Sequence, residues 1–118
     1  MINKDIISSK VTKIMYFRDK NNTPVGCLAS KINGDVITIG VSSWCNFDTI
    51  NKKIGRQLAI ERMEYKPITI HTTTETSARD VVSTICKHII HNYRNFSYAI
   101  STKVVNSIRS RIKAAQNR

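Results

Sequence analysis

Cysteine and histidine are the side chains of this sequence best suited to covalent chemistry. Cys45 comes just before an expected helix, where exposed backbone amides and the helix dipole can lower a thiol pKa. A cysteine hydrolase would need His71, His88 or His91 to reach Cys45, and a third group to orient that histidine. The neighbouring Trp44 is more typical of a packed strand end. We therefore expect a structural thiol and no catalytic residue.

Metal chemistry has a similarly incomplete set of ligands. His88 and His91 can share one helix face, with Cys86 just before them, but a third and a fourth ligand are missing. The three cysteines are an odd number and form no Cys-x-x-Cys pair, so reduced thiols are expected. No close carboxylate pair suits general acid–base catalysis, and the four glycines are too dispersed for a phosphate-binding loop. The sequence thus predicts neither a metal site nor a cofactor, and a protein that is not an enzyme.

Positive charge is the strongest chemical feature of the chain. The 118 residues hold 19 Lys and Arg against 8 Asp and Glu, for a formal net charge of +11. Residues 81–118 carry a net charge of +7 without a single acidic side chain. Helices whose charges only keep them soluble usually mix both signs. This composition favours an anionic partner, either nucleic acid or an acidic protein surface.

The candidate phosphate ligands are basic side chains. They lie on the expected helices 49–64 and 101–116 and on the segment that precedes residue 101. Few Asn or Gln side chains share their faces, so contacts to backbone phosphates are favoured over base reading. Three aromatic residues beside Arg94 could stack on unpaired bases or close one end of the core. The basic candidates are Lys52, Lys53, Arg56, Arg62, Arg94, Lys103, Arg109, Arg111 and Lys113, and the aromatic ones are Tyr93, Phe96 and Tyr98.

Strands in the first half and helices in the second must position these residues. Period-two patterns predict strands over about 11–18, 25–32, 36–43 and 67–72, and helical spacing predicts helices over about 49–64, 77–93 and 101–116. Asn33-Gly34 favours a type I′ hairpin between the second and third strands. We expect one α+β domain over residues 1–118, an antiparallel sheet covered by helices on one face.

The first helix has an apolar repeat and a basic ridge. Ile50, Ile54 and Leu58 recur every four residues and are expected to face the sheet, with Lys52, Lys53 and Arg56 beside or opposite them. Gly55 lowers helix stability by up to about 1 kcal/mol relative to alanine, which close backbone packing would offset.

Targeting signals are lacking in the sequence given. The N-terminal residues have no uninterrupted apolar core, and no stretch approaches the roughly 18–20 apolar residues of a membrane span. We therefore expect a cytoplasmic protein with no membrane partner.

One segment resembles a known group of proteins. Residues 36–63, above all the run KKIGRQLAIERM from Lys52 to Met63, resemble a recurring element of small uncharacterised bacteriophage proteins. In these proteins a β-hairpin leads into a helix of the type Lys-Lys-x-Gly-Arg-x-x-Ala-x-x-Arg. The resemblance covers about a quarter of the chain and implies a phage origin. The excess of Ile, Asn and Lys, typical of an AT-rich genome, agrees with that origin.

Two functions from different classes follow. The first is a small, basic, non-enzymatic phage-type protein that binds DNA or RNA through backbone phosphates, in transcription or genome handling. The second is a phage-encoded inhibitor or modulator that docks on an acidic surface of a host enzyme or defence complex. In that case its partner anchors would be Trp44, Tyr93, Phe96 and Tyr98, and it would act in the host cytoplasm.

Overall fold

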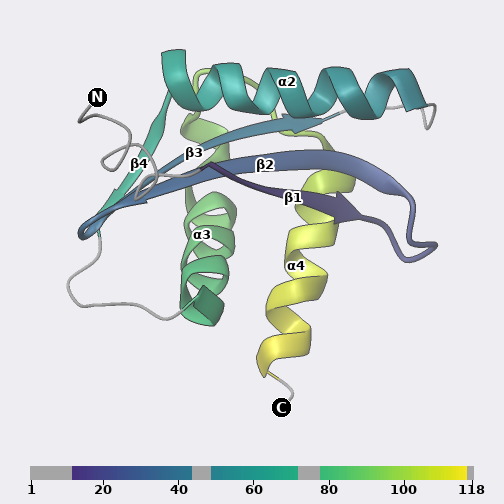
Figure 1. Ribbon diagram of the computed structural model, residues 1–118. Coiled ribbons are helices and arrows are strands. Elements are labelled where there is room, and N and C mark those ends of the chain that lie inside the picture. The colour runs from purple at the N-terminus through teal and green to yellow at the C-terminus, as the bar shows by residue number, and fades with distance from the viewer. Residues whose placement is uncertain (1–11, 44–48, 72–77, 117–118) are drawn as a thin grey trace.

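Four consecutive antiparallel strands form the central sheet of the protein. A computed structural model describes residues 12–43, 49–71 and 78–116 (Figure 1). The α+β class is confirmed, and the bounds lie within two residues of the predicted ones wherever both are described. The elements are β1 (Lys13–Arg18), β2 (Pro24–Asn33), β3 (Val36–Ser43), α2 (Thr49–Tyr65), β4 (Ile68–His71), α3 (Ala78–Asn92), a 3-10 turn (Tyr93–Asn95) and α4 (Thr102–Gln116).

The strands pair in chain order, β1-β2-β3-β4, as a meander. In the β2–β3 hairpin, Asn33 pairs with Val36, so that Gly34 and Asp35 form a two-residue loop. Of these two, only Gly34 has a positive φ, +66°, as in a type II′ turn. The predicted type I′ turn is therefore wrong, because Asn33 belongs to the strand and Gly34 takes the first loop position.

Helices cover both faces of the sheet, in contrast to the single covered face expected from the sequence. Helix α2 packs on β2 and β3, while α3 and α4 lie on the opposite face (Figure 1). Strand β2 explains this arrangement, since all six residues from Val25 to Ser30 are buried. Such a run, without the alternation of buried and exposed residues, is typical of a strand covered on both sides.

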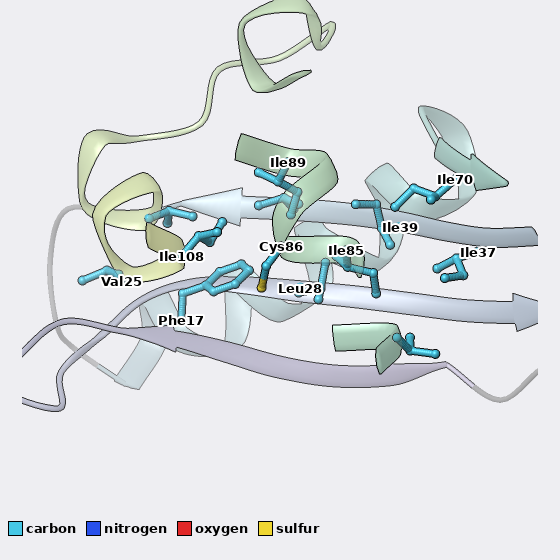
Figure 2. Close-up of a cluster of buried hydrophobic side chains, with 13 residues drawn as sticks. Phe17, Val25, Leu28, Ile37, Ile39, Ile70, Ile85, Cys86, Ile89 and Ile108 are labelled. Carbon is cyan, nitrogen blue, oxygen red and sulfur yellow. The ribbon is translucent and has the colours of Figure 1, made fainter. Parts of the chain in front are cut away.

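The larger core fills the layer between the sheet and helices α3 and α4. Ile37, Ile39 and Val41 point into it from alternate positions of β3, as their period-two spacing predicts. Figure 2 shows this cluster, to which the strands, α3 and α4 contribute side chains, with Phe17 towards one end and Ile37 and Ile70 towards the other. The buried members are Phe17, Val25, Leu28, Ile37, Ile39, Val41, Ile70, Val81, Ile85, Cys86, Ile89, Val104 and Ile108.

A smaller cluster lies between α2 and the other face of the sheet. Its buried members are small or flexible: Cys27, Ala29, Ala59 and Met63. Ile54 is 55% exposed and Leu58 is half-buried, so the predicted contact with the sheet is wrong for Ile54, while the side chain of Ile50 lies outside the described residues. Burial of Ala59 and Met63 sets the angular position of the helix, which turns Ile54 towards solvent.

Glycine makes the close approach of α2 possible. A Cβ atom added to Gly40 of β3 would collide with the backbone of α2 at Ala59 and Met63. The Ser42 hydroxyl donates a hydrogen bond to the Gly55 carbonyl oxygen at 2.6 Å, and Gly55 is buried. Gly55 is thus buried in contact with β3, while the backbone-to-backbone approach is the one at Gly40.

Helix α4 packs at one end and projects at the other. Val104 and Ile108, in its first two turns, are fully buried against the sheet. Beyond Ile108 the helix continues away from the sheet towards the C-terminus (Figure 1, yellow). Arg109, Arg111 and Lys113, all exposed, belong to this projecting part.

Candidate anion-binding surface on helix α4

The sheet separates the two groups of basic residues that the sequence analysis singled out. Lys53 and Arg56 are exposed on α2, on one side of the sheet. Arg109 and Lys113 are exposed on α4, on the other side (Figure 1). A single contact surface formed by both helices is therefore excluded for these four side chains. The side chain of Lys52 lies outside the described residues.

The basic residues of α4 do not all share one face. Arg109 and Lys113 are four residues apart and lie one turn above each other. Arg111 is rotated by about 200° from Arg109, since each residue turns the helix by about 100°. Its charge opposes the effect of burial on the Cys86 thiol, which places Arg111 towards α3.

A stripe of polar and basic side chains runs along one face of α4. Lys103, Asn106, Ser110 and Lys113 are three or four residues apart, and all four side chains are exposed. We call these four residues the α4 stripe. It extends over about 15 Å of helix, combines two cations with two neutral hydrogen-bonding groups and contains no acid.

The N-terminal part of the α4 stripe, from Lys103 to Ser110, forms one wall of a groove. The opposite wall is the turn between β1 and β2, and the groove has a volume of about 500 Å³. Its main polar lining is Arg18, Lys20, Asn21, Lys103, Asn106 and Ser110. Of these residues, only Lys103 is a candidate from the sequence. Asn106 and Ser110 are neutral residues of α4, and Arg18, Lys20 and Asn21 come from the distant β1–β2 turn, so only the folded arrangement of the turn against α4 identifies the groove.

Hydrogen bonds fix the shape of the β1–β2 turn. Oδ1 of Asp19 accepts from the backbone N–H groups of Asn21 and Thr23, both at 2.9 Å. Arg18 donates from Nη1 to the carbonyl oxygen of Asn22 at 3.1 Å, and Asn22 adopts a φ of +64°. One wall of the groove is therefore a tight, internally bonded turn, whose carboxylate is already used by the backbone.

The side chain of Arg62 is bonded within the fold. Its contacts with Val41 and Tyr98 account for its position without a ligand. Strand β4 pairs with β3 no further than Ile39, which leaves the backbone of Val41 beyond the end of β4. Arg62 donates from Nη1 to the Val41 carbonyl oxygen at 2.8 Å, and the Tyr98 hydroxyl accepts from the Val41 N–H at 3.1 Å. The guanidinium of Arg62 lies 4.1 Å from the centroid of the Tyr98 ring.

Burial shapes the acidity of Tyr98 as well as its position. Burial raises the pKa of the Tyr98 hydroxyl, while its hydrogen bond with Val41 and the charge of Arg62 oppose that rise. The phenol therefore stays neutral at physiological pH and keeps a lone pair for the Val41 N–H.

The other predicted aromatic residues line the segment between α3 and α4. Tyr93 and Phe96 are half-buried and pack against the larger core. Phe96 stacks on His88 with ring centroids 6.4 Å apart, and the exposed Arg94 lies 5.6 Å from the centroid of the Tyr93 ring. Contact with the core accounts for these rings, so base stacking stays a prediction. Trp44 lies outside the described residues.

The described thiols are poorly suited to nucleophilic chemistry. Burial raises the pKa of Cys27 to about 11, against the opposing charge of Arg56, and burial also raises the pKa of Cys86. Both thiols are free and buried, whereas Cys45 lies outside the described residues. Within the described part of the chain, no three His, Cys, Asp or Glu side chains gather closely enough to hold a metal ion.

Comparison with known proteins gives no relative for this fold and surface. No family model, no curated protein and no solved structure matches the chain. None of the helices within the described residues combines the length and apolar character needed to cross a bilayer. The architecture defines a small, basic α+β protein with one helix on one face of a sheet and two on the other.

Proposed function

We propose that this protein binds nucleic acid through backbone phosphates, with the exposed face of α4 as its main contact. The observation that carries the proposal is the composition of this helix in its place in the fold. Its exposed positions include Lys103, Arg109, Arg111 and Lys113, and no acidic residue follows Asp80 anywhere in the chain. Three of these cations, Arg109, Arg111 and Lys113, are exposed on the part of α4 that extends away from the sheet (Figure 1).

Phosphate binding suits this surface better than base reading does. Each Lys or Arg that neutralises a phosphate releases condensed counterions, which gives affinity without sequence preference. The α4 stripe adds the neutral side chains of Asn106 and Ser110, which can donate to phosphate oxygens. Arg62 is excluded from the proposed contact set because it bonds Val41 and stacks on Tyr98.

The test is fluorescence anisotropy with short single- and double-stranded DNA and RNA at two salt concentrations. In the double variant Arg109→Glu/Lys113→Glu we expect a Kd more than about tenfold higher at low salt, because two phosphate contacts become repulsive. The matched control, Lys53→Glu/Arg56→Glu, changes the net charge equally but on the opposite side of the sheet. We expect its Kd to stay within about threefold of the original.

Two results would argue against the proposal. Equal losses in both double variants would show that only total charge matters. Weak binding of the unmodified protein to all four nucleic acids would remove the function itself. A steep salt dependence together with a preference for one nucleic acid would instead support it and define the ligand.

A specific observation on α2 favours a second candidate function, docking on an acidic protein surface. Among the side chains that the structure describes, Ile54 and Tyr65 are the two large apolar ones that are strongly exposed, at 55% and 79%. They are eleven residues apart and so lie on the same side of α2. Aromatic and aliphatic side chains of this kind are typical anchors of protein interfaces. This proposal moves the anchors from Tyr93, Phe96 and Tyr98, which pack against the core, to α2.

Capture from a nuclease-treated host lysate separates the two proposals. A stoichiometric protein partner should survive nuclease treatment and be lost with Ile54→Ser/Tyr65→Ser, but be retained with Arg109→Glu/Lys113→Glu. The reverse pattern would favour nucleic acid. A phage origin and a host target accompany this second proposal and rest on the resemblance of residues 36–63 alone.

A further inference from the structure

We propose that the groove between the β1–β2 turn and α4 is a binding site for one phosphodiester group of a nucleic-acid backbone. This inference rests on the proposed function and specifies where the backbone is held. It adds Lys20, Asn21 and Ser107 to the contact residues, none of which belongs to the basic clusters visible in the sequence.

The charge of the groove favours an anion. Its lining contains three cations, Arg18, Lys20 and Lys103, against one carboxylate, Asp19. Oδ1 of that carboxylate accepts two backbone hydrogen bonds within the turn and so belongs to the scaffold of the wall. The lining therefore keeps a formal charge of +2 in a concave space, where an anion is attracted from several sides at once.

The neutral side chains of the groove match a phosphate oxygen in chemistry. Asn21, Asn106 and Ser110 line it with amide and hydroxyl groups. Such groups supply a large part of the hydrogen bonds to backbone phosphates in protein–nucleic acid complexes. Together with the cations they form a mixed set of donors from two separate elements, a turn and a helix.

Ser107 is the most informative residue of the groove. Its side chain lines the groove although the residue is only 7% exposed. Among the described residues, no hydrogen bond to its side chain is formed. Every fully enclosed side-chain nitrogen or oxygen in that part of the chain does have a partner, so the Ser107 hydroxyl keeps contact with the groove. A hydroxyl in this position gains a partner when an anion enters.

The groove also connects to the rest of the proposed surface. Lys103, Asn106 and Ser110 belong to both the groove and the α4 stripe, and Lys113 follows Ser110 by one turn. A backbone with one phosphate in the groove would then continue along α4 towards its projecting end. The internally bonded β1–β2 turn fixes one wall of the groove before binding, which lowers the conformational entropy lost when the complex forms.

Ser107→Ala tests the inference without changing the charge of the protein. We expect about a tenfold higher Kd for the preferred nucleic acid, because a hydrogen bond to a charged group is lost. Thermal stability should not fall, since the hydroxyl has no partner within the described residues to lose. Ser83→Ala on α3 is the matched control, because Ser83 does not line the groove, and its Kd should be unchanged.

Lys20→Ala tests the charge of the groove through the salt dependence of binding. Loss of one phosphate contact should reduce the slope of log K against log salt by about 0.9 for double-stranded DNA, or about 0.7 for single strands. Lys53→Ala removes the same charge on the opposite side of the sheet. Its slope should match that of the unmodified protein.

The outcomes distinguish this inference from the proposed function. If the unmodified protein binds nucleic acid but Ser107→Ala and Lys20→Ala behave like their controls, the groove is not the phosphodiester-binding site, and the proposed nucleic-acid binding is retained. If the unmodified protein shows no salt-dependent binding, both proposals are wrong. Competition by submillimolar sodium phosphate at constant ionic strength would assign the groove to free phosphate and overturn the backbone assignment.

Discussion

The two helical layers are held on the same sheet by different kinds of contact. Helix α2 approaches so closely that the backbone of β3 at Gly40 meets the backbone of α2 at Ala59 and Met63. Helices α3 and α4 are held on the sheet by buried aliphatic side chains, such as Ile89 and Ile108, and a Cβ atom added to Gly26 of β2 would meet the side chain of Val104 and not the backbone of α4. A backbone contact depends on the absence of side chains, whereas an aliphatic contact depends on their shape.

The same two layers also differ in charge. Exposed Glu61 and Glu64 accompany Lys53 and Arg56 on α2, so that this surface mixes both signs. No acid is found in residues 81–118, which include all of α4. Mixed charge is typical of a solvated helix, whereas all charged residues of α4 have the same sign, which is the feature behind the proposed anion-binding role of α4.

Gly40→Ala is the strongest way to break the α2 contact. One added carbon atom would collide with helix backbone that cannot rotate away, and α2 would have to separate from β3. We expect the free energy of unfolding to fall by more than about 3 kcal/mol, above the usual cost of overpacking with side chains. Chemical denaturation monitored by circular dichroism measures this loss.

Gly34→Ala provides the control for that experiment. No atom lies within 4 Å of a Cβ added there, but the φ of +66° strains an L-residue. The expected loss is about 1 kcal/mol, from backbone strain alone. Equal losses at the two glycines would show that the close approach of α2 is not what Gly40 provides.

Tyr98→Phe tests the contact by which the two layers meet at the end of β3. The substitution removes the acceptor of the Val41 N–H and leaves the ring available to Arg62. We expect a loss of about 2 kcal/mol, the cost of an unsatisfied buried donor. Tyr93→Phe, at a residue whose hydroxyl forms no hydrogen bond with a described residue, should change stability by less than about 0.5 kcal/mol.

Ile108→Val tests how sensitive the aliphatic layer is to the loss of one carbon atom. Ile108 is fully buried, so removing one methyl group should lower the free energy of unfolding by about 1 kcal/mol. Ile54→Val on α2 makes the same change at an exposed position and should stay within about 0.5 kcal/mol of the original. A loss at Ile108 as large as that of Gly40→Ala would remove the distinction between the layers.

The two kinds of packing explain which parts of the fold the sequence predicts. In α3 and α4 the apolar stripes are made of large side chains, and Ile85, Ile89, Val104 and Ile108 are buried as their spacing indicates. In α2 the buried face consists of Gly55, Ala59 and Met63, which hydrophobic spacing does not distinguish from a neutral face. The more apolar Ile54 was therefore placed on the wrong side of the helix.

The candidate site was predicted only in part, for a related reason. The missing acids of residues 81–118 are visible in the sequence and point to α4 without knowledge of the fold. The groove depends on the β1–β2 turn meeting α4, and no local pattern connects Lys20 with Ser110. Arg62 has an internal partner, the Val41 carbonyl oxygen, which its place among other basic residues in the sequence does not reveal.

Acid pH should weaken the α3–α4 layer through His88, in the smallest of the four effects. Burial lowers the pKa of His88 below 6.5, and the nearby charge of His91 lowers it further. The unfolded chain therefore binds more protons than the folded one once the pH falls below about 6.5, so the contribution of His88 is complete above that pH and is lost below it. Melting temperatures should decrease between pH 7.5 and 5.5, and His88→Gln should remove part of that decrease. His71→Gln, at an exposed position of β4, should leave the decrease unchanged. If both variants keep the full pH dependence, another group destabilises the protein in acid. The stacking of His88 on Phe96 would then not depend on the charge of the His88 ring.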